Sequence, residues 1–174
     1  MSLLSRRSVI VGVPAASLGA TGALAATGAA GATALAEPEP TVITFTARRT
    51  KATLANVPAV VPALGTTFIA CLDLRDGTGT SIGDGSVNGS IVDVILGVPP
   101  RLVVQAHVIF RLPDGEIHTS NMHVRTIPNP GVQHLVAITG GTAAYRTARG
   151  SGTIEHTTDK DTTVVLNVLV DPPA

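Results

Sequence analysis

The sequence lacks the residues that mark several large classes of protein. It has no Trp, one Tyr, three Phe and a single Cys among 174 residues. One cysteine excludes an internal disulfide framework and a cysteine-based zinc site. Twelve Lys and Arg balance twelve Asp and Glu, and a net charge of zero argues against nucleic-acid binding, which requires a basic excess. The sequence also has no phosphate-binding loop and no nucleophile elbow.

The N-terminal segment has the organisation of an export signal. Arg6 and Arg7 precede an uncharged stretch of Ala, Gly, Thr, Val and Leu, which ends at the small-x-small site Ala34-Leu35-Ala36. This order is typical of a secretory signal, and the paired arginines indicate the twin-arginine type. A transmembrane anchor is the alternative, but the many Gly, Thr and Ser residues weaken transfer into lipid. We expect a cleaved signal over residues 1–36, a single domain over residues 37–174, and a periplasmic or extracellular protein without stable membrane insertion.

The rest of the chain consists of short β-branched segments separated by Gly, Pro and Asp, with no helical period. In Arg101–Arg111, every even position is apolar, and Pro113-Asp114-Gly115 predicts a hairpin to the next segment. About eight antiparallel strands favour an all-β, closed antiparallel β-barrel, because closure removes the sheet edges. A β-sandwich is the alternative. We expect strands at Thr41–Arg48, Thr66–Leu74, Gly89–Leu96, Arg101–Arg111, Glu116–Arg125, Val132–Thr139, Ala144–Thr157 and Thr162–Val170.

Several of these strands carry polar residues at one parity. Alternate residues of a barrel strand point inward, so this set either lines a ligand cavity or faces solvent while apolar residues fill the interior. If it lines a cavity, Leu102, Val104 and Val108 face outward and need cover from a second barrel. The polar set is Cys71 and Asp73, Gln105 and His107, and Glu155.

The most distinctive segment is Gly140–Gly150, with the sequence Gly-Gly-Thr-Ala-Ala-Tyr-Arg-Thr-Ala-Arg-Gly. Its first two glycines allow a sharp turn. Tyr145 and Arg149 lie four apart and would share a face of an unbroken strand. A buried Arg requires a carboxylate or a polar ligand. Arg149 therefore either belongs to a site or forms a structural ion pair, for which the available acids are Asp73, Asp76 and Glu155.

This segment resembles the Gly-Gly-Thr-Gly-x-[Phe/Tyr]-x-x-Ala-Arg-Gly signature of dirigent proteins and the related allene oxide cyclase barrels. Ala143 stands where that signature usually has Gly. Leu64-Gly65-Thr66 and the hairpin from Phe110 to Glu116 follow in the family's order, and the likeness extends over residues 41–170. The resemblance implies a barrel that works without metal or organic cofactor and assembles as a dimer or trimer.

For function, the resemblance implies an apolar cavity that holds a reactive lipophilic molecule in one conformation. The expected activity is that of a cofactor-free cyclase or isomerase, which steers ring closure of a polyketide-like or phenolic secondary metabolite. Arg149 and Tyr145 would polarise a substrate oxygen, and Asp73 or Glu155 would act as general acid or base. The further expected groups are His107 as proton shuttle and Gln105, Cys71 and Asn88 as substrate contacts. The alternatives are a non-catalytic carrier of a lipophilic ligand and a structural protein with a filled core.

Overall fold

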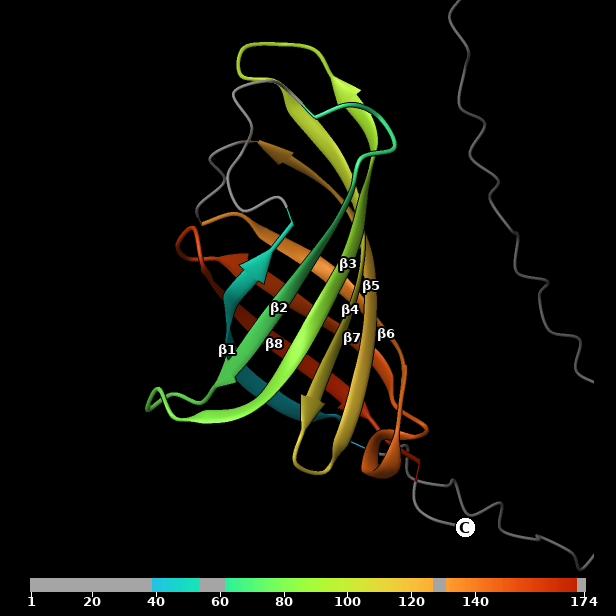
Figure 1. The fold of residues 1–174 in the computed structure, drawn as a ribbon. Coiled ribbons are helices and arrows are strands. Elements are labelled where there is room, and N and C mark those ends of the chain that lie inside the picture. Colours follow the sequence, from blue (N-terminus) through green and yellow to red (C-terminus); the bar gives the residue numbers. More distant parts are fainter. Residues whose placement is uncertain (1–38, 54–61, 127–130, 172–174) are drawn as a thin grey trace, which may run out of the picture. The chain divides into compact units, whose positions relative to one another are not determined.

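The computed structural model is a closed antiparallel barrel of eight strands (Figure 1). This confirms the all-β barrel and not the sandwich. The structure describes residues 39–53, 62–126 and 131–171. The predicted signal over 1–36 lies outside these residues, so export and cleavage stay predictions. Within the described ranges, no helix has the length and apolar character needed to cross a membrane.

Each strand pairs with its neighbours in sequence, and the first strand pairs with the last to close the barrel. The elements are β1 (Thr41–Ala52), β2 (Thr67–Arg75), β3 (Ser81–Ile95), β4 (Arg101–Leu112), β5 (Gly115–Thr126), β6 (Gln133–Gly141), the 3-10 turn η1 (Ala143–Tyr145), β7 (Arg149–His156) and β8 (Asp161–Leu169). We call the end with η1 and the β4–β5 turn the lower end, and the end where β5 stops and β6 starts the upper end (Figure 1).

Two elements differ from the sequence prediction. β3 begins at Ser81, eight residues before the predicted start at Gly89, and so includes the glycine-rich segment Gly83–Asn88. At Gly89, a Cβ would lie 2.3 Å from Cζ of Phe68, so the missing side chain leaves room for that ring inside the barrel. The segment Ala144–Thr157 is not one strand. Its first residues belong to η1, where backbone hydrogen bonds from Tyr145 to Thr142 and from Ala148 to Tyr145 tighten the turn.

Two apolar clusters occupy the interior. The larger one fills the lower half of the barrel around Phe45 and Phe110, whose rings meet edge to face at 5.0 Å between centroids. The smaller one lies against β2, β3 and β4 toward the upper end, and its members are Phe68, Ile91, Val94, Leu102 and Val104. Leu102, Val104 and Val108 are therefore buried inside the barrel. These three residues need no cover from a second barrel. A dimer or trimer stays a prediction, but exposed apolar residues on β4 no longer support it.

Strands β5 and β6 pair over a short distance only. Their ladder joins Ile117–Ser120 to Ala137–Gly141, with a register shift beside Gly140, whose φ is +148°. β5 itself continues to Thr126 and stays paired with β4 over its whole length. Beyond this ladder, toward the upper end, the described residues of β5 and β6 are not paired with each other. The inward side chains of the second half of β5 and of the start of β6 lie in this unpaired region.

One residue of η1 has a strained backbone, which leads to a stability prediction. Ala143 has a φ of +49°, a region that a Cβ disfavours by about 1–2 kcal/mol. We expect Ala143→Gly to raise the free energy of unfolding by up to about 1 kcal/mol, because the strain relieved exceeds the freedom added to the unfolded chain. Urea unfolding measures the change. Ala144→Gly is the matched control, because its φ is not positive, and it should lower stability. Equal effects of the two substitutions would contradict the assignment.

Candidate functional site

Most residues predicted to line a cavity lie on the outer face of the barrel. On β4 the even-numbered side chains are buried, so Gln105 and His107 are exposed. Cys71 and Asn88 are exposed as well. The prediction that this parity faces inward is wrong, and the alternative of a solvent-facing polar set is right. The physical reason is that the apolar set on the same strands is larger and gains more from burial.

The two predicted carboxylates also belong to the outer parity. Asp73 accepts hydrogen bonds from Ser81 Oγ at 2.6 Å and from Arg75 Nε at 2.7 Å, and these bonds hold the pKa of its carboxyl below the ordinary value. Glu155 is half-buried and alternates with Ile154 and His156 on β7, which point inward. The structure therefore does not bring Asp73 and Glu155 together inside the barrel.

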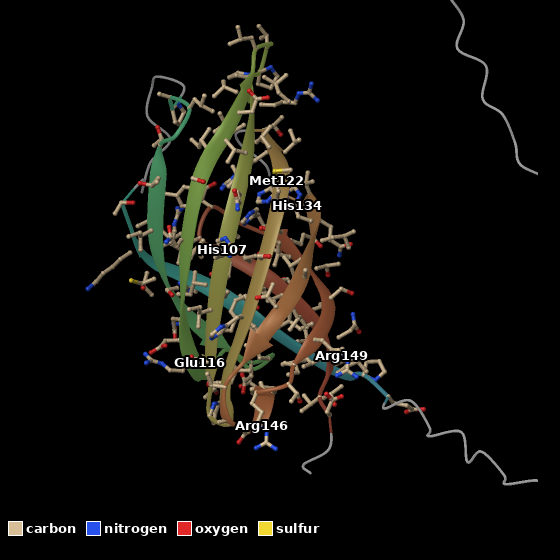
Figure 2. The ribbon with its side chains drawn as sticks, turned by 90° about the vertical axis from the view of Figure 1, so that its right-hand side faces the viewer. His107, Glu116, Met122, His134, Arg146 and Arg149 are labelled. Atoms are coloured by element: carbon tan, nitrogen blue, oxygen red, sulfur yellow. The ribbon has the colours of Figure 1, made fainter. Side chains whose placement is uncertain are left out.

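Tyr145 and Arg149 do not share a strand face. Tyr145 ends η1 and packs against the lower core, where burial raises the pKa of its phenol. Arg149 begins β7, is exposed, and forms an ion pair with Asp171. Figure 2 shows Arg149 near the lower end of the barrel and His134 toward the upper end. Arg149 therefore forms an exposed ion pair, and its partner is none of the three acids considered from the sequence.

A different set of polar side chains points into the upper end of the barrel. Pairing of Phe110 with Ile117 places the odd-numbered side chains of β5 on the same inner face as the even-numbered side chains of β4. On β6, His134 has the parity of Val136 and Ile138, which are buried in the core. We call the inward polar set the histidine–arginine cluster: Arg49 of β1, Asn121, His123 and Arg125 of β5, His134 of β6, and His156 of β7.

The three imidazoles of the cluster lie close together. The ring centroids of His123 and His134 are 4.2 Å apart and tilted by 33°, and those of His134 and His156 are 6.3 Å apart. Nδ1 of His156 lies 2.9 Å from Oγ1 of Thr162, which orients that ring. In the part of the chain that the structure describes, no group of three or more His, Cys, Asp or Glu is arranged to hold a metal ion. The rings of His123 and His134 lie face to face with a tilt, and the rings of His134 and His156 meet edge to face.

The cluster is electrostatically positive. Burial lowers the pKa of His123 and that of His156 to about 4, with further lowering by neighbouring cationic groups. Burial and the charge of Arg125 also lower the pKa of His134. The imidazoles are therefore neutral at pH 7, and each offers one N–H and one lone pair. Burial lowers the pKa of the Arg125 guanidinium as well; Arg49 adds to this effect, and Asp159 opposes it.

Three buried nitrogen atoms of the cluster have no hydrogen-bond partner among the described residues. They are Nδ2 of Asn121, Nδ1 of His123 and Nε of Arg125. Buried polar atoms are nearly always paired, and leaving one unpaired costs about 1–3 kcal/mol. The remaining arc of the upper interior, on β2, β3 and β4, is apolar. This arrangement suits a molecule with an apolar body and one or more oxygen atoms, which would accept the missing hydrogen bonds.

This cluster is absent from the residues predicted from the sequence, although the sequence contains a signal for it. β5 has polar residues at both parities, so its own pattern does not identify the inner face. The predicted hairpin at Pro113-Asp114-Gly115, combined with the inward even positions of β4, would have placed Ile117 and the odd residues after it inside. The inner face of β5 can therefore be read only from its partner strand.

Known proteins supply a fold comparison. No protein-family model and no curated protein matches the sequence. Among solved structures, pyocyanin demethylase is similar with a TM-score of 0.61 and 18% identity, over 74% of this chain and 100% of that one. The Diels-Alderase AbmU from Streptomyces koyangensis is similar with a TM-score of 0.55 and 19% identity, over 77% and 75% of the two chains. A cyclase that catalyses a cycloaddition during neoabyssomicin biosynthesis has a TM-score of 0.53, 16% identity and coverage of 76% and 69%. At these identities the likeness establishes a shared barrel fold.

The outer position of Arg149 leads to a prediction about stability. Its side chain and that of Asp171 are 49% and 51% exposed, and exposed ion pairs contribute at most about 1 kcal/mol. We expect Arg149→Ala to lower the free energy of unfolding by less than about 1 kcal/mol, as measured by urea unfolding at pH 7. A loss of several kcal/mol would show that the pair is part of the structural core.

The buried imidazoles predict a specific dependence of stability on pH. Their ordinary pKa is 6.5, and His123 and His156 have a pKa of about 4 in the folded protein. The unfolded chain therefore binds more protons between these values, and the free energy of unfolding should be constant above pH 6.5 and fall toward pH 4. The loss is of order 2–3 kcal/mol per imidazole.

Urea unfolding at several pH values tests this expectation. His123→Gln should reduce the slope of the unfolding free energy against pH by the contribution of about one proton, because one buried titrating group is removed. Gln105→Ala is the control, because Gln105 is exposed on the outer face and carries no titrating group, and it should leave the slope as in the native sequence. The same slope in all three proteins would refute the buried, neutral state of His123.

Proposed function

We propose that this protein is a cofactor-free cyclase or isomerase, of the allene oxide cyclase-like or dirigent-like kind. In this proposal the upper end of the barrel binds a small lipophilic secondary metabolite, polyketide-like or phenolic, and steers its ring closure. The observation that carries the proposal is the row of buried nitrogens on Asn121, His123 and Arg125, which have no partner among the described residues and lie beside an apolar arc. The fold shared with a Diels-Alderase and a cycloaddition cyclase supports it.

The two arcs of the interior have separate roles in this scheme. The apolar arc of Phe68, Ile91, Leu102 and Val104 packs against the carbon skeleton and limits it to a folded conformation. Holding two reacting ends together in this way replaces a large entropic part of the barrier to ring closure. The apolar core of the lower half gives the site a rigid base, because its side chains are closely packed.

The polar arc acts on the electrons of the substrate. As a ring closes on a double bond conjugated with a carbonyl group, negative charge accumulates on the carbonyl oxygen. Nε–H of Arg125 and Nδ2–H of Asn121 are donors without other partners among the described residues, and in this proposal they donate to that oxygen and stabilise its charge. His123, neutral at pH 7, can accept the proton when the substrate must first enolise. Ring closure only redistributes bonds, so it needs no oxidant or reductant.

A synthetic probe tests the proposal. The probe is a diene tethered to an alkene that is conjugated with a 1,3-dicarbonyl group, and chiral chromatography follows its closure. We expect the protein to accelerate closure and to give one stereoisomer in excess. Arg125→Met should lower the rate by about 10²-fold, as loss of one preorganised donor does. Arg149→Met, which removes an exposed guanidinium at the lower end, should not.

The alternative to catalysis is a carrier that returns its ligand unchanged. If fluorescence shows that the probe is bound, but its closure has the uncatalysed rate and gives a racemic product, the carrier hypothesis is correct and the proposed catalysis is wrong. Equal rates for Arg125→Met and the native protein would remove Arg125 from the reaction.

A further inference from the structure

We propose that the interior site selects small lipophilic anions whose charge is shared by two oxygens, such as a carboxylate or an enolised 1,3-dicarbonyl group. Arg125 would pair with the charge, and Asn121 and His123 would hydrogen-bond to the same group. Neutral or cationic molecules of the same shape would bind more weakly. The inference rests on the proposed function for the location of the site, and it adds the charge and the polar head of the ligand.

Positive charge predominates inside the upper end of the barrel. Arg49 and Arg125 act on the interior imidazoles, and both lower the pKa of His156. Two acidic side chains near this end do not face the interior. Oδ1 of Asp161 lies 3.9 Å from Nε of Arg48, whose side chain is on the outer face of β1. Glu155 precedes the inward-pointing His156 on β7, so its side chain is on the outer face as well. Asp159, in the exposed turn between β7 and β8, is the acid that raises the pKa of Arg125.

A second feature is the state of Arg125 itself. Its Nε is buried without a hydrogen-bond partner among the described residues. The salt bridges recorded for the described residues join other pairs, and none of them includes Arg125. A buried cation costs several kcal/mol unless a counter-charge and hydrogen bonds compensate it. A ligand that carries its own negative charge supplies both, whereas a neutral ligand supplies hydrogen bonds alone and a cation adds repulsion.

A third feature is the spacing of the donors. Asn121, His123 and Arg125 occupy alternate positions of β5 and so form a row on its inner face. Neighbouring members of such a row are about 6–7 Å apart at their Cα atoms, and side chains of this length reach toward a common group between them. Two oxygens at one end of a ligand match such a pair of donors better than a single hydroxyl does. The apolar arc on β2, β3 and β4 then receives the rest of the molecule.

The test compares three naphthalene probes that differ only in the polar head: 2-naphthoate, 2-naphthalenemethanol and 2-naphthylmethylammonium. Isothermal titration calorimetry at pH 8 measures the three dissociation constants on the full chain. We expect 2-naphthoate to bind at least about tenfold more tightly than the alcohol, the gain expected for hydrogen bonds to a charged group. The ammonium probe should bind more weakly than the alcohol.

Three variants connect the preference to one side chain. Arg125→Met removes the charge and retains the apolar volume, so the affinities for 2-naphthoate and the alcohol should become equal within about twofold. Arg125→Lys retains the charge and should keep most of the preference, which separates charge from shape. Arg149→Met removes an exposed guanidinium at the other end, so its three affinities should equal those of the native protein.

The outcomes separate this inference from the proposed catalysis. Equal affinities for the three probes, or an anion preference that survives in Arg125→Met, would overturn the inference. If the ring-closing probe still cyclises in that case, the catalysis stands without the anion site. Selective, Arg125-dependent binding of 2-naphthoate without any ring closure would support the anion site and refute the catalysis.

Discussion

Closure of the sheet is the constraint on which the rest of this structure depends. Because β1 pairs with β8, every strand has two partners, and the alternation of its side chains is set by both of them. The even-numbered side chains of β4 form an unbroken apolar row inside the barrel. Because Phe110 is paired with Ile117, the odd-numbered side chains of β5 must also point inward. The same constraint places His107 in solvent and His123 in the interior, although both are histidines in the middle of strands.

The barrel divides its interior between stability and a candidate site. The lower half is an apolar core around the Phe45–Phe110 pair, and burial of this surface stabilises the fold. In the upper half, burial instead holds imidazoles neutral and leaves nitrogen atoms without partners among the described residues. Such groups lower the stability of the fold. Departures from complete polar pairing are typical of functional sites, which is why the upper half carries the proposals.

The cluster also depends on contacts between distant parts of the chain. Arg49 on β1 and His156 on β7 are more than 100 residues apart, yet the charge of one lowers the pKa of the other. The ring of His134 on β6 lies against that of His123 on β5, although the described residues of the two strands are not paired there. No single segment contains the site, so a short motif could not have identified it. The distinctive glycine-rich segment marks the turn at the lower end, where Gly140, Ala143 and Gly150 take positive φ values.

The sequence by itself determined the fold class, the number of strands and the main turns. Period-two alternation, β-branched residues and Gly or Pro at the breaks depend on local chemistry, so they can be read from the chain. The resemblance of Gly140–Gly150 to the dirigent signature also indicated that residue 143 occupies a glycine position. Only the tertiary structure decided which face of β5 and of β7 points inward, because these two strands have polar residues at both parities and their own pattern is ambiguous. The inner face of each follows from its hydrogen-bonded neighbours, and through them from closure of the whole barrel.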